Sequence, residues 1–190
     1  MHIRELAPSD VDQYTALRLR MLREYSEAFT SSFDEEAIKP LTWAQKRISP
    51  GDDAPHDFVL GAFSEDGTLI GSIGLAVESR CKQRHKALLF GMFVAPEEMS
   101  AGFGRGLLDA CLDRARCSPD LEQINLTVTA TNARAMRLYE AAGFRTFGME
   151  ERALKIGGAY HTKAHMVMCL VPSPKPATTL MAQREYPPTA

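Results

Sequence analysis

Hydrophobic and polar positions divide the chain into short strands and single helices. Apolar runs and alternation predict strands at residues 2–6, 58–63, 68–77, 86–94, 123–130, 144–149 and 163–171. Apolar residues at helical spacing predict helices over residues 9–25, from about residue 43, over 103–117 and over 132–142. Strands mixed with single helices favour an α+β fold with a mixed sheet.

Turn and capping residues mark several element boundaries. Asp66-Gly67 predicts a hairpin turn. The spacings Ser9-x-x-Asp12 and Thr42-x-x-Gln45 are typical of helix starts, and residues 29–40 are predicted to be irregular. Residues 86–94 are apolar almost throughout, so this strand is expected to be central and buried on both faces.

Length and composition fit one globular domain. The chain has 190 residues, of which 45% are hydrophobic and 24% charged. We expect a domain over residues 1–171 and a Pro-rich tail over 172–190 that could dock on a partner. A net charge of -2 argues against binding to nucleic acid or to an anionic membrane surface.

The expected location is the cytoplasm. The longest apolar run, residues 87–95, is too short to cross a bilayer, and the N-terminus has no apolar signal segment. The four cysteines have no Cys-x-x-Cys spacing, which fits free thiols in a reducing compartment. His161 and His165 lack a third ligand at metal-binding spacing, so no metal site is expected.

The segment from Met99 to Gly106 predicts an anion-binding loop. A Gly-Phe-Gly sequence at residues 102–104 stands between an apolar strand and an amphipathic helix, where backbone N–H groups and the helix dipole attract anions. A P-loop is excluded because Gly104-Arg105-Gly106 replaces Gly-Lys-Ser/Thr. A dinucleotide fingerprint is excluded because Leu107 takes the place of its last glycine.

Two readings of Arg105 stay open. A cation in the first turn opposes the helix dipole, and a bound anion would make it better tolerated. Alternatively, Arg105 is a good helix former on an exposed face. Likewise, Asn132 is a suitable N-cap, and Tyr139, seven residues later on the same helix face, could be a core residue or a functional one.

Together the two stretches resemble the signatures of the GNAT superfamily of acetyl-CoA-dependent N-acetyltransferases. The family loop reads Arg/Gln-x-x-Gly-x-Gly/Ala, and residues 99–104 read Met-Ser-Ala-Gly-Phe-Gly. The second family signature, Asn-x-x-Ala-x-x-Leu-Tyr-x-x-x-Gly-Phe, matches residues 132–144 in full. The resemblance covers roughly residues 88–168 and implies a splayed, mostly antiparallel sheet flanked by helices, with acetyl-CoA wedged where two central strands part.

The resemblance also implies roles for individual residues. The backbone of Met92, Phe93 and Val94 would pair with the pantetheine arm, Asn132 would contact it, and Tyr139 would protonate the leaving thiolate. The pyrophosphate would lie on the loop formed by Met99, Ser100, Ala101, Gly102, Phe103 and Gly104, with Arg105 as an additional cation.

Met99 departs from the family pattern, which has a phosphate-pairing cation there. The expected function is direct transfer of acetyl to a primary amine, either a small molecule or a peptide N-terminus. The alternative is a non-catalytic acyl-CoA sensor or interaction module. Spacing does not select a general base among Glu78, His85, Glu150 and Glu151, and an acidic stretch at residues 34–36 could attract a cationic amine. A homodimer is left open.

Overall fold

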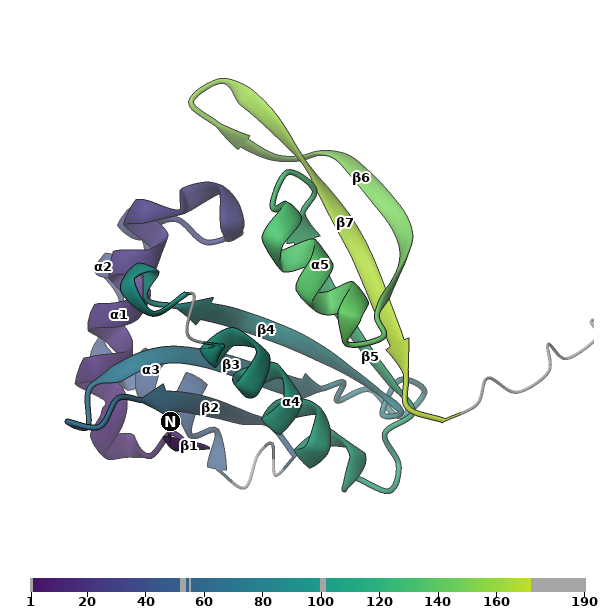
Figure 1. The fold of residues 1–190 in the computed structure, drawn as a ribbon, viewed down its shortest axis with the longest axis horizontal. Helices are drawn as coiled ribbons and strands as arrows, with labels where there is room; N and C mark the ends of the chain where they lie inside the picture. The colour runs from purple at the N-terminus through teal and green to yellow at the C-terminus, as the bar shows by residue number, and fades with distance from the viewer. Residues whose placement is uncertain (1, 52–53, 55, 100–101, 172–190) are drawn as a thin grey trace, which may run out of the picture.

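A single sheet runs through the molecule, and its strands part in the middle (Figure 1). The computed structural model describes residues 2–51, 54, 56–99 and 102–171, so the predicted tail and the site residues Ser100 and Ala101 lie outside the described part. The seven strands lie in the order β1-β2-β3-β4-β5-β7-β6. Their bounds are β1 His2–Glu5, β2 Phe58–Phe63, β3 Leu69–Val77, β4 Lys86–Val94, β5 Gln123–Thr129, β6 Arg145–Ile156 and β7 Ala159–Cys169.

Strand pairing explains where the sheet opens. All neighbouring strands are antiparallel except β4 and β5, which are parallel. That pair is short, because only residues 86–88 of β4 meet residues 123–125 of β5. Beyond Leu88 the two strands diverge, and the fold is the predicted mixed sheet with mostly antiparallel pairing.

The helices lie on both faces of the sheet. Helix α4 packs on β2 and β3 in front of the sheet in Figure 1, whereas α1 and α3 lie behind it. The helices are α1 Val11–Glu24, α2 Phe33–Ala37, α3 Leu41–Ile48, α4 Phe103–Arg116 and α5 Ala133–Ala141. The single-turn 3₁₀ helices are η1 Pro8–Asp10, η2 Ser26–Ala28 and η4 Pro96–Glu98.

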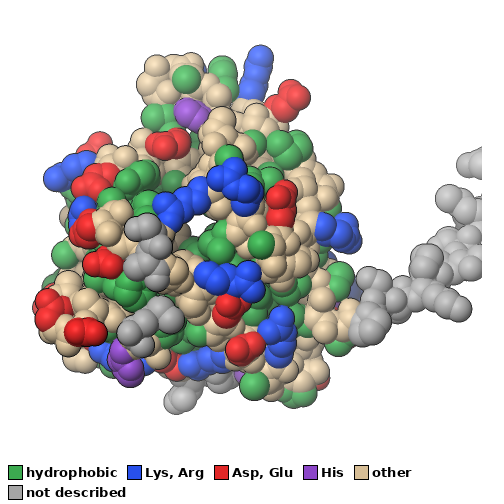
Figure 2. Space-filling view, viewed as in Figure 1, with side chains coloured by type: hydrophobic (Ala, Val, Ile, Leu, Met, Phe, Trp, Pro, Cys, Tyr) green, Lys and Arg blue, Asp and Glu red, His purple; other side chains and the backbone are tan. Residues whose placement is uncertain are grey.

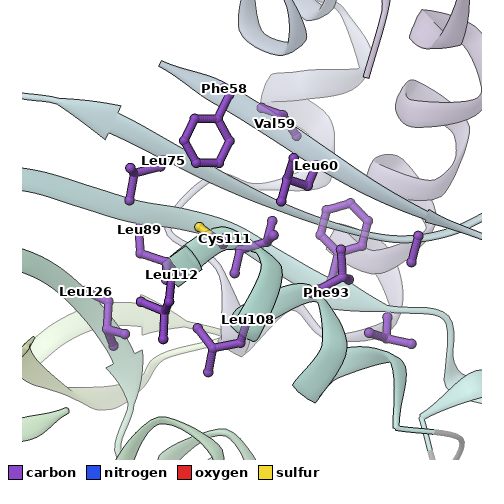
Figure 3. Packing of buried hydrophobic residues seen from close by; sticks show 14 of the residues in the cluster. Phe58, Val59, Leu60, Leu75, Leu89, Phe93, Leu108, Cys111, Leu112 and Leu126 are labelled. Atoms are coloured by element: carbon purple, nitrogen blue, oxygen red, sulfur yellow. The ribbon is translucent and has the colours of Figure 1, made fainter. Parts of the chain in front are cut away.

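The core between α4 and the sheet fixes the position of the helix (Figure 3). Leu108, Cys111 and Leu112 project from α4 toward Leu75 and Leu89, and all five are buried. Their spacing is the apolar periodicity that predicted this helix. Because this face of α4 is held against the sheet, the helix N-terminus is held close to the C-terminal end of β4.

Two predicted helix starts are wrong in detail. Helix α3 begins at Leu41 after Pro40, and no side chain caps it, so Thr42-x-x-Gln45 is not a capping box. The segment predicted to be irregular contains α2, whose capping box is Ser32 with Glu35. The Glu35 backbone N–H donates to the Ser32 hydroxyl, and the Ser32 N–H donates to the Glu35 carboxylate. Helix α1 begins after η1 with Asp10 as N-cap, not at Ser9.

The predicted burial of β4 is also wrong in part. The strand is central, but Leu88 is 42% exposed and Phe90 and Met92 are only half-buried, so one face of the strand is incompletely covered. Strands β6 and β7 are longer than predicted and form a protruding hairpin. In the part of the chain that the structure describes, no helix combines the length and apolar character that a membrane span requires.

Candidate active site

A cavity of about 490 Å³ lies where β4 and β5 part. Figure 2 shows a hollow in this face with Lys and Arg side chains gathered at its rim. One part of the wall comes from the end of β4 and the residues that follow it, and a second from Thr129 and the first turns of α5. The third comes from the end of α1 and the segment after it, and contains Met21, Tyr25, Glu27, Ala28 and Phe29.

The β4 side of the cavity offers an unpaired strand edge. From Leu89 onward, β4 pairs with β3 on one side and has no β5 partner on the other. Met92, Phe93 and Val94 line the cavity along this edge. Alternate backbone N–H and C=O groups of the edge are therefore available to a ligand that carries amide groups, as the pantetheine arm of acetyl-CoA does.

The glycine loop meets the cavity at the N-terminus of α4. Gly102 is the N-cap of the helix and has φ +83°, a left-handed conformation that favours glycine. A Cβ built at Gly102 would have no other atom within 4 Å. In the chain without a ligand, glycine is therefore favoured by the left-handed backbone and not by lack of space. Gly104 lines the cavity, whereas Gly102, Phe103 and Arg105 are outside its wall. This arrangement fits the cradle predicted for a pyrophosphate.

Two arginines near this loop have different surroundings. Arg105 is half exposed and forms an i, i+4 ion pair with Asp109 at 2.8 Å, which accounts for it as a surface residue. Arg134, in the first turn of α5, lines the cavity, and its Nη2 donates a hydrogen bond to the Met99 carbonyl. A guanidinium therefore lies beside the loop although position 99 is not a cation.

Asn132 and Tyr139 both line the cavity, one at each end of a two-turn stretch of α5. The Asn132 Oδ1 caps the helix by accepting from the Ala135 backbone N–H at 3.0 Å. The Tyr139 ring packs edge-on against Phe144 with the ring centres 5.8 Å apart. Its hydroxyl donates to the Met92 sulfur at 3.4 Å, on the unpaired strand edge. Burial raises the pKa of Tyr139, so the hydroxyl is fully protonated at neutral pH in the free protein.

The general bases considered from the sequence lie away from the cavity wall. Glu78 and His85 belong to the connection between β3 and β4, at the end of the sheet where β4 and β5 still pair. Glu150 is bonded to His165 at 2.9 Å, and Glu151 is exposed on the hairpin. Among the described residues that line the cavity, Glu27 is the one that carries a carboxylate.

The acidic stretch at residues 34–36 is not a free negative surface. Glu36 is buried and forms a two-fold hydrogen-bonded pair with Arg18, with contacts of 2.9 and 3.0 Å. Burial raises the pKa of Glu36 and the Arg18 guanidinium lowers it, and the net direction is downward, so the pair is ionised. Glu35 serves the capping box of α2. These contacts neutralise the part of the stretch that faces the core.

The structure brings the predicted residues Met92, Phe93, Val94, Met99, Gly104, Asn132 and Tyr139 into one cavity wall. Reasoning from the sequence missed Glu27, Phe29 and Arg134. Arg134 stands inside the matched signature at a position the signature leaves unspecified, and no local pattern singles out the other two. Within the described ranges, no three His, Cys, Asp or Glu side chains form a group that could hold a metal ion.

Comparison with known proteins gives one consistent family. The model of the GNAT acetyltransferase domain matches residues 3–167. The spermidine N(1)-acetyltransferase of Vibrio cholerae is 30% identical over 111 residues, which are 58% of this chain and 64% of that protein. The chain therefore matches less than two thirds of the length of this curated relative.

Solved structures agree on the fold. The GNAT acetyltransferase of Streptococcus pneumoniae superposes with a TM-score of 0.76 at 26% identity, over 88% of this chain and 98% of that one. The Salmonella typhimurium protein yncA, solved with its cofactor acetyl-CoA, superposes with a TM-score of 0.73 at 21% identity, over 94% of this chain and 98% of that one. The family model spans almost the whole described chain, and the chain belongs to the GNAT family of acetyltransferases.

Proposed function

We propose that the chain transfers the acetyl group of acetyl-CoA directly to a primary amine. The observation that carries this proposal is the cavity at the strand divergence, where an unpaired β4 edge, the glycine loop and the Tyr139 hydroxyl meet. Acetyl-CoA supplies an activated acetyl group as a thioester. The amide groups of its pantetheine arm suit the edge formed by residues 92–94, and its phosphates suit the N-terminus of α4.

Arg134 is the cation that we assign to the phosphates in place of Met99. It lines the cavity, and its guanidinium lies against the carbonyl at the start of the loop. Arginine presents several N–H donors, so Arg134 can keep this hydrogen bond and still donate to a phosphate oxygen. Arg105 is already paired with Asp109 and is outside the cavity wall.

The reaction needs two proton movements, and the cavity offers a group for each. An amine attacks as the neutral base, and we assign the carboxylate of Glu27, a residue of the cavity wall, to accept its proton directly or through water. As the C–N bond forms and the C–S bond breaks, the Tyr139 hydroxyl donates a proton to the departing sulfur. The proton lost by the amine balances the proton gained by the thiol, and the products are an amide and free CoA.

The residues of the cavity favour direct transfer of acetyl to the amine over a route through an acetylated side chain of the enzyme. Among the described residues in the cavity wall, none is cysteine or serine. Cys111 is near Tyr139 but fully buried, and burial raises the pKa of its thiol to about 12. A thiol with that pKa is almost entirely protonated at neutral pH and is a poor nucleophile.

Two measurements on the wild-type chain test the proposal. Calorimetry should show saturable binding of acetyl-CoA, and a thiol-detecting assay should show CoA release that requires an added amine. Binding without release across small amines, polyamines and peptide N-termini would favour the alternative of an acyl-CoA sensor. Absence of binding would contradict both.

A further inference from the structure

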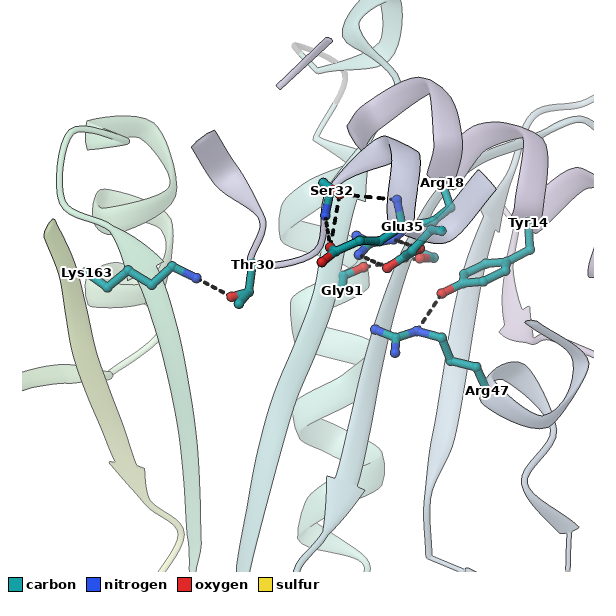
Figure 4. Close-up of polar contacts among 10 residues, drawn as sticks. Tyr14, Arg18, Thr30, Ser32, Glu35, Arg47, Gly91 and Lys163 are labelled. Atoms are coloured by element: carbon teal, nitrogen blue, oxygen red, sulfur yellow. Dashed lines mark hydrogen bonds and ion pairs between the residues drawn. The ribbon is translucent and has the colours of Figure 1, made fainter. Parts of the chain in front are cut away.

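Lys163 is a buried ammonium that forms no ion pair with any described residue. It lies on β7 with 6% of its surface exposed, and its Nζ donates to the Thr30 hydroxyl at 2.6 Å (Figure 4). Glu150 faces it across the β6–β7 ladder, but that carboxylate is bonded to His165.

The position of Lys163 links it to the cavity. Its partner across the β5–β7 ladder is Thr129, which lines the cavity. Directly opposed residues of an antiparallel pair point to the same face of a sheet. Both side chains reach the same segment of the wall, because the Thr129 hydroxyl donates to the Glu27 carbonyl at 2.5 Å and Lys163 reaches Thr30.

Both negatively and positively charged side chains lie near residues 27–30. Glu27 lines the cavity at one end of the segment. At the other end the Lys163 ammonium lies just outside the cavity lining, against Thr30, which follows the lining residue Phe29. Arg18 lies 4.6 Å from the Phe29 ring between them, but Glu36 neutralises it. Burial lowers the pKa of Lys163 by more than the charge of Glu150 raises it, so the nearby carboxylate offsets the cost of burying the ammonium only in part.

We propose that the acceptor is a small primary amine that also carries an anionic group, as an amino acid does. The proposal rests on the proposed function. The amine is received near Glu27, and an anionic oxygen replaces the neutral Thr30 hydroxyl as the partner of Lys163. A buried ammonium is costly unless it is paired, so pairing with the acceptor stabilises the complex. A polyamine, which is cationic along its length, would bring like charge to Lys163.

The hydrogen bonds from Thr129 and Lys163 also argue for a small acceptor. They tie residues 27–30, part of the cavity wall, to β5 and β7. A long peptide would have to displace both contacts, whereas an amino acid needs to exchange only the Thr30 hydroxyl.

The experiment compares acceptors that differ by a single carboxylate. Methionine is paired with 3-(methylthio)propylamine and phenylalanine with phenethylamine, and spermidine and an alanine-terminated peptide complete the set. Wild-type kcat/KM should be at least about 10-fold higher for the amino acid of each pair, since a hydrogen bond to a charged group contributes on that order. The Lys163→Met variant should lose this preference and keep its acetyl-CoA affinity.

Two control variants separate recognition from structure. Lys163→Arg keeps the cation and should retain most of the preference. Lys155→Met removes an exposed cation from the same hairpin and should change nothing. Equal rates with the two members of each pair, a preference for spermidine, or a uniform loss across all acceptors in Lys163→Met would overturn the inference. CoA release with no amine at all would instead contradict the proposed function.

Discussion

The two walls of the cavity are built in different ways. The wall that we assign to the cofactor consists of the ends of regular elements, namely the edge of β4 and the N-termini of α4 and α5. The wall that we assign to the acceptor is a connecting segment, residues 25–32, whose one regular element is the single-turn helix η2. Side chains from β5 and β7 that are more than a hundred residues away hold it in place. The first wall depends on backbone conformations that particular residues impose, and the second depends on contacts that only the folded chain creates.

Gly102→Val should have the largest effect on the cofactor wall. A left-handed conformation costs about 1–2 kcal/mol for an L side chain, and the methyl groups of valine would stand where a phosphate must approach. We expect acetyl-CoA affinity to fall by more than about 100-fold, with the fold retained. Gly67→Val is the matched control, because Gly67 also has φ +83° with no neighbour within 4 Å and lies far away in a hairpin turn. Equal affinity in the two variants would contradict the loop assignment.

Glu27→Gln tests the acceptor wall. Loss of a positioned base lowers turnover by roughly 10²-fold or more, and we expect the low end because water can replace an exposed carboxylate. Acetyl-CoA affinity should not change. Glu24→Gln is the control, since Glu24 is close in sequence, pairs with Arg20 and does not line the cavity. Full turnover in Glu27→Gln would remove Glu27 from the mechanism.

Tyr139→Phe tests the point where the two walls meet. The variant keeps the ring contact with Phe144 and loses the hydroxyl that touches the Met92 sulfur. We expect turnover to fall by about 10-fold, at or below the usual range for a general acid, because a thiolate leaves tolerably well unprotonated. Steady-state rates, calorimetry and melting temperature should be compared with Tyr14→Phe, which removes a buried hydroxyl bonded to Arg47. A stability change alone would make Tyr139 a packing residue.

Arg134→Met should have a smaller effect on the cofactor wall. Arg134 is exposed, so water and salt screen the attraction between its guanidinium and a phosphate. We therefore expect acetyl-CoA affinity to fall by several-fold at low salt and by less at high salt. Arg137→Met removes a cation one turn along the same helix, outside the cavity wall, and should leave affinity unchanged. If both variants behave alike, the effect is general attraction of a polyanion rather than contact with Arg134.

Met99→Arg should have the smallest effect. The sequence alone predicts a several-fold gain in affinity, because the family cation is absent at this position. The structure predicts a change of less than about two-fold, since Arg134 already lies at the Met99 carbonyl. A larger gain, measured by calorimetry at low salt, would show that the phosphate site of the wild-type chain lacks a cation. In the double variant, Met99→Arg should restore the acetyl-CoA affinity that Arg134→Met loses.

Sequence reasoning succeeds where local pattern and structure coincide. The bounds of β2 and β4 and the start of α4 are as predicted, because apolar runs and a glycine loop delimit them. The full lengths of β6 and β7 escape prediction because Glu150, Glu151 and Arg152 lie on an exposed edge and lack the alternation of a half-buried strand. The left-handed Arg152, with φ 56°, further interrupts the ladder there.

The same division holds within the site. Asn132, Tyr139 and Gly102 are visible in the sequence because two signatures contain them. Arg134, Glu27 and Lys163 become recognisable only through partners that lie 35, 102 and 133 residues away. No periodicity encodes such contacts, so the acceptor wall could not be derived before the structure.

The most direct test of the account measures the product. The chain should be incubated with acetyl-CoA carrying a ¹³C-labelled acetyl group and an equimolar mixture of amines, and analysed by mass spectrometry beside a thiol assay. We predict one labelled N-acetyl amide formed for each CoA released, with no labelled protein. CoA release without a labelled amide, or label retained on the chain, would contradict direct transfer to an amine.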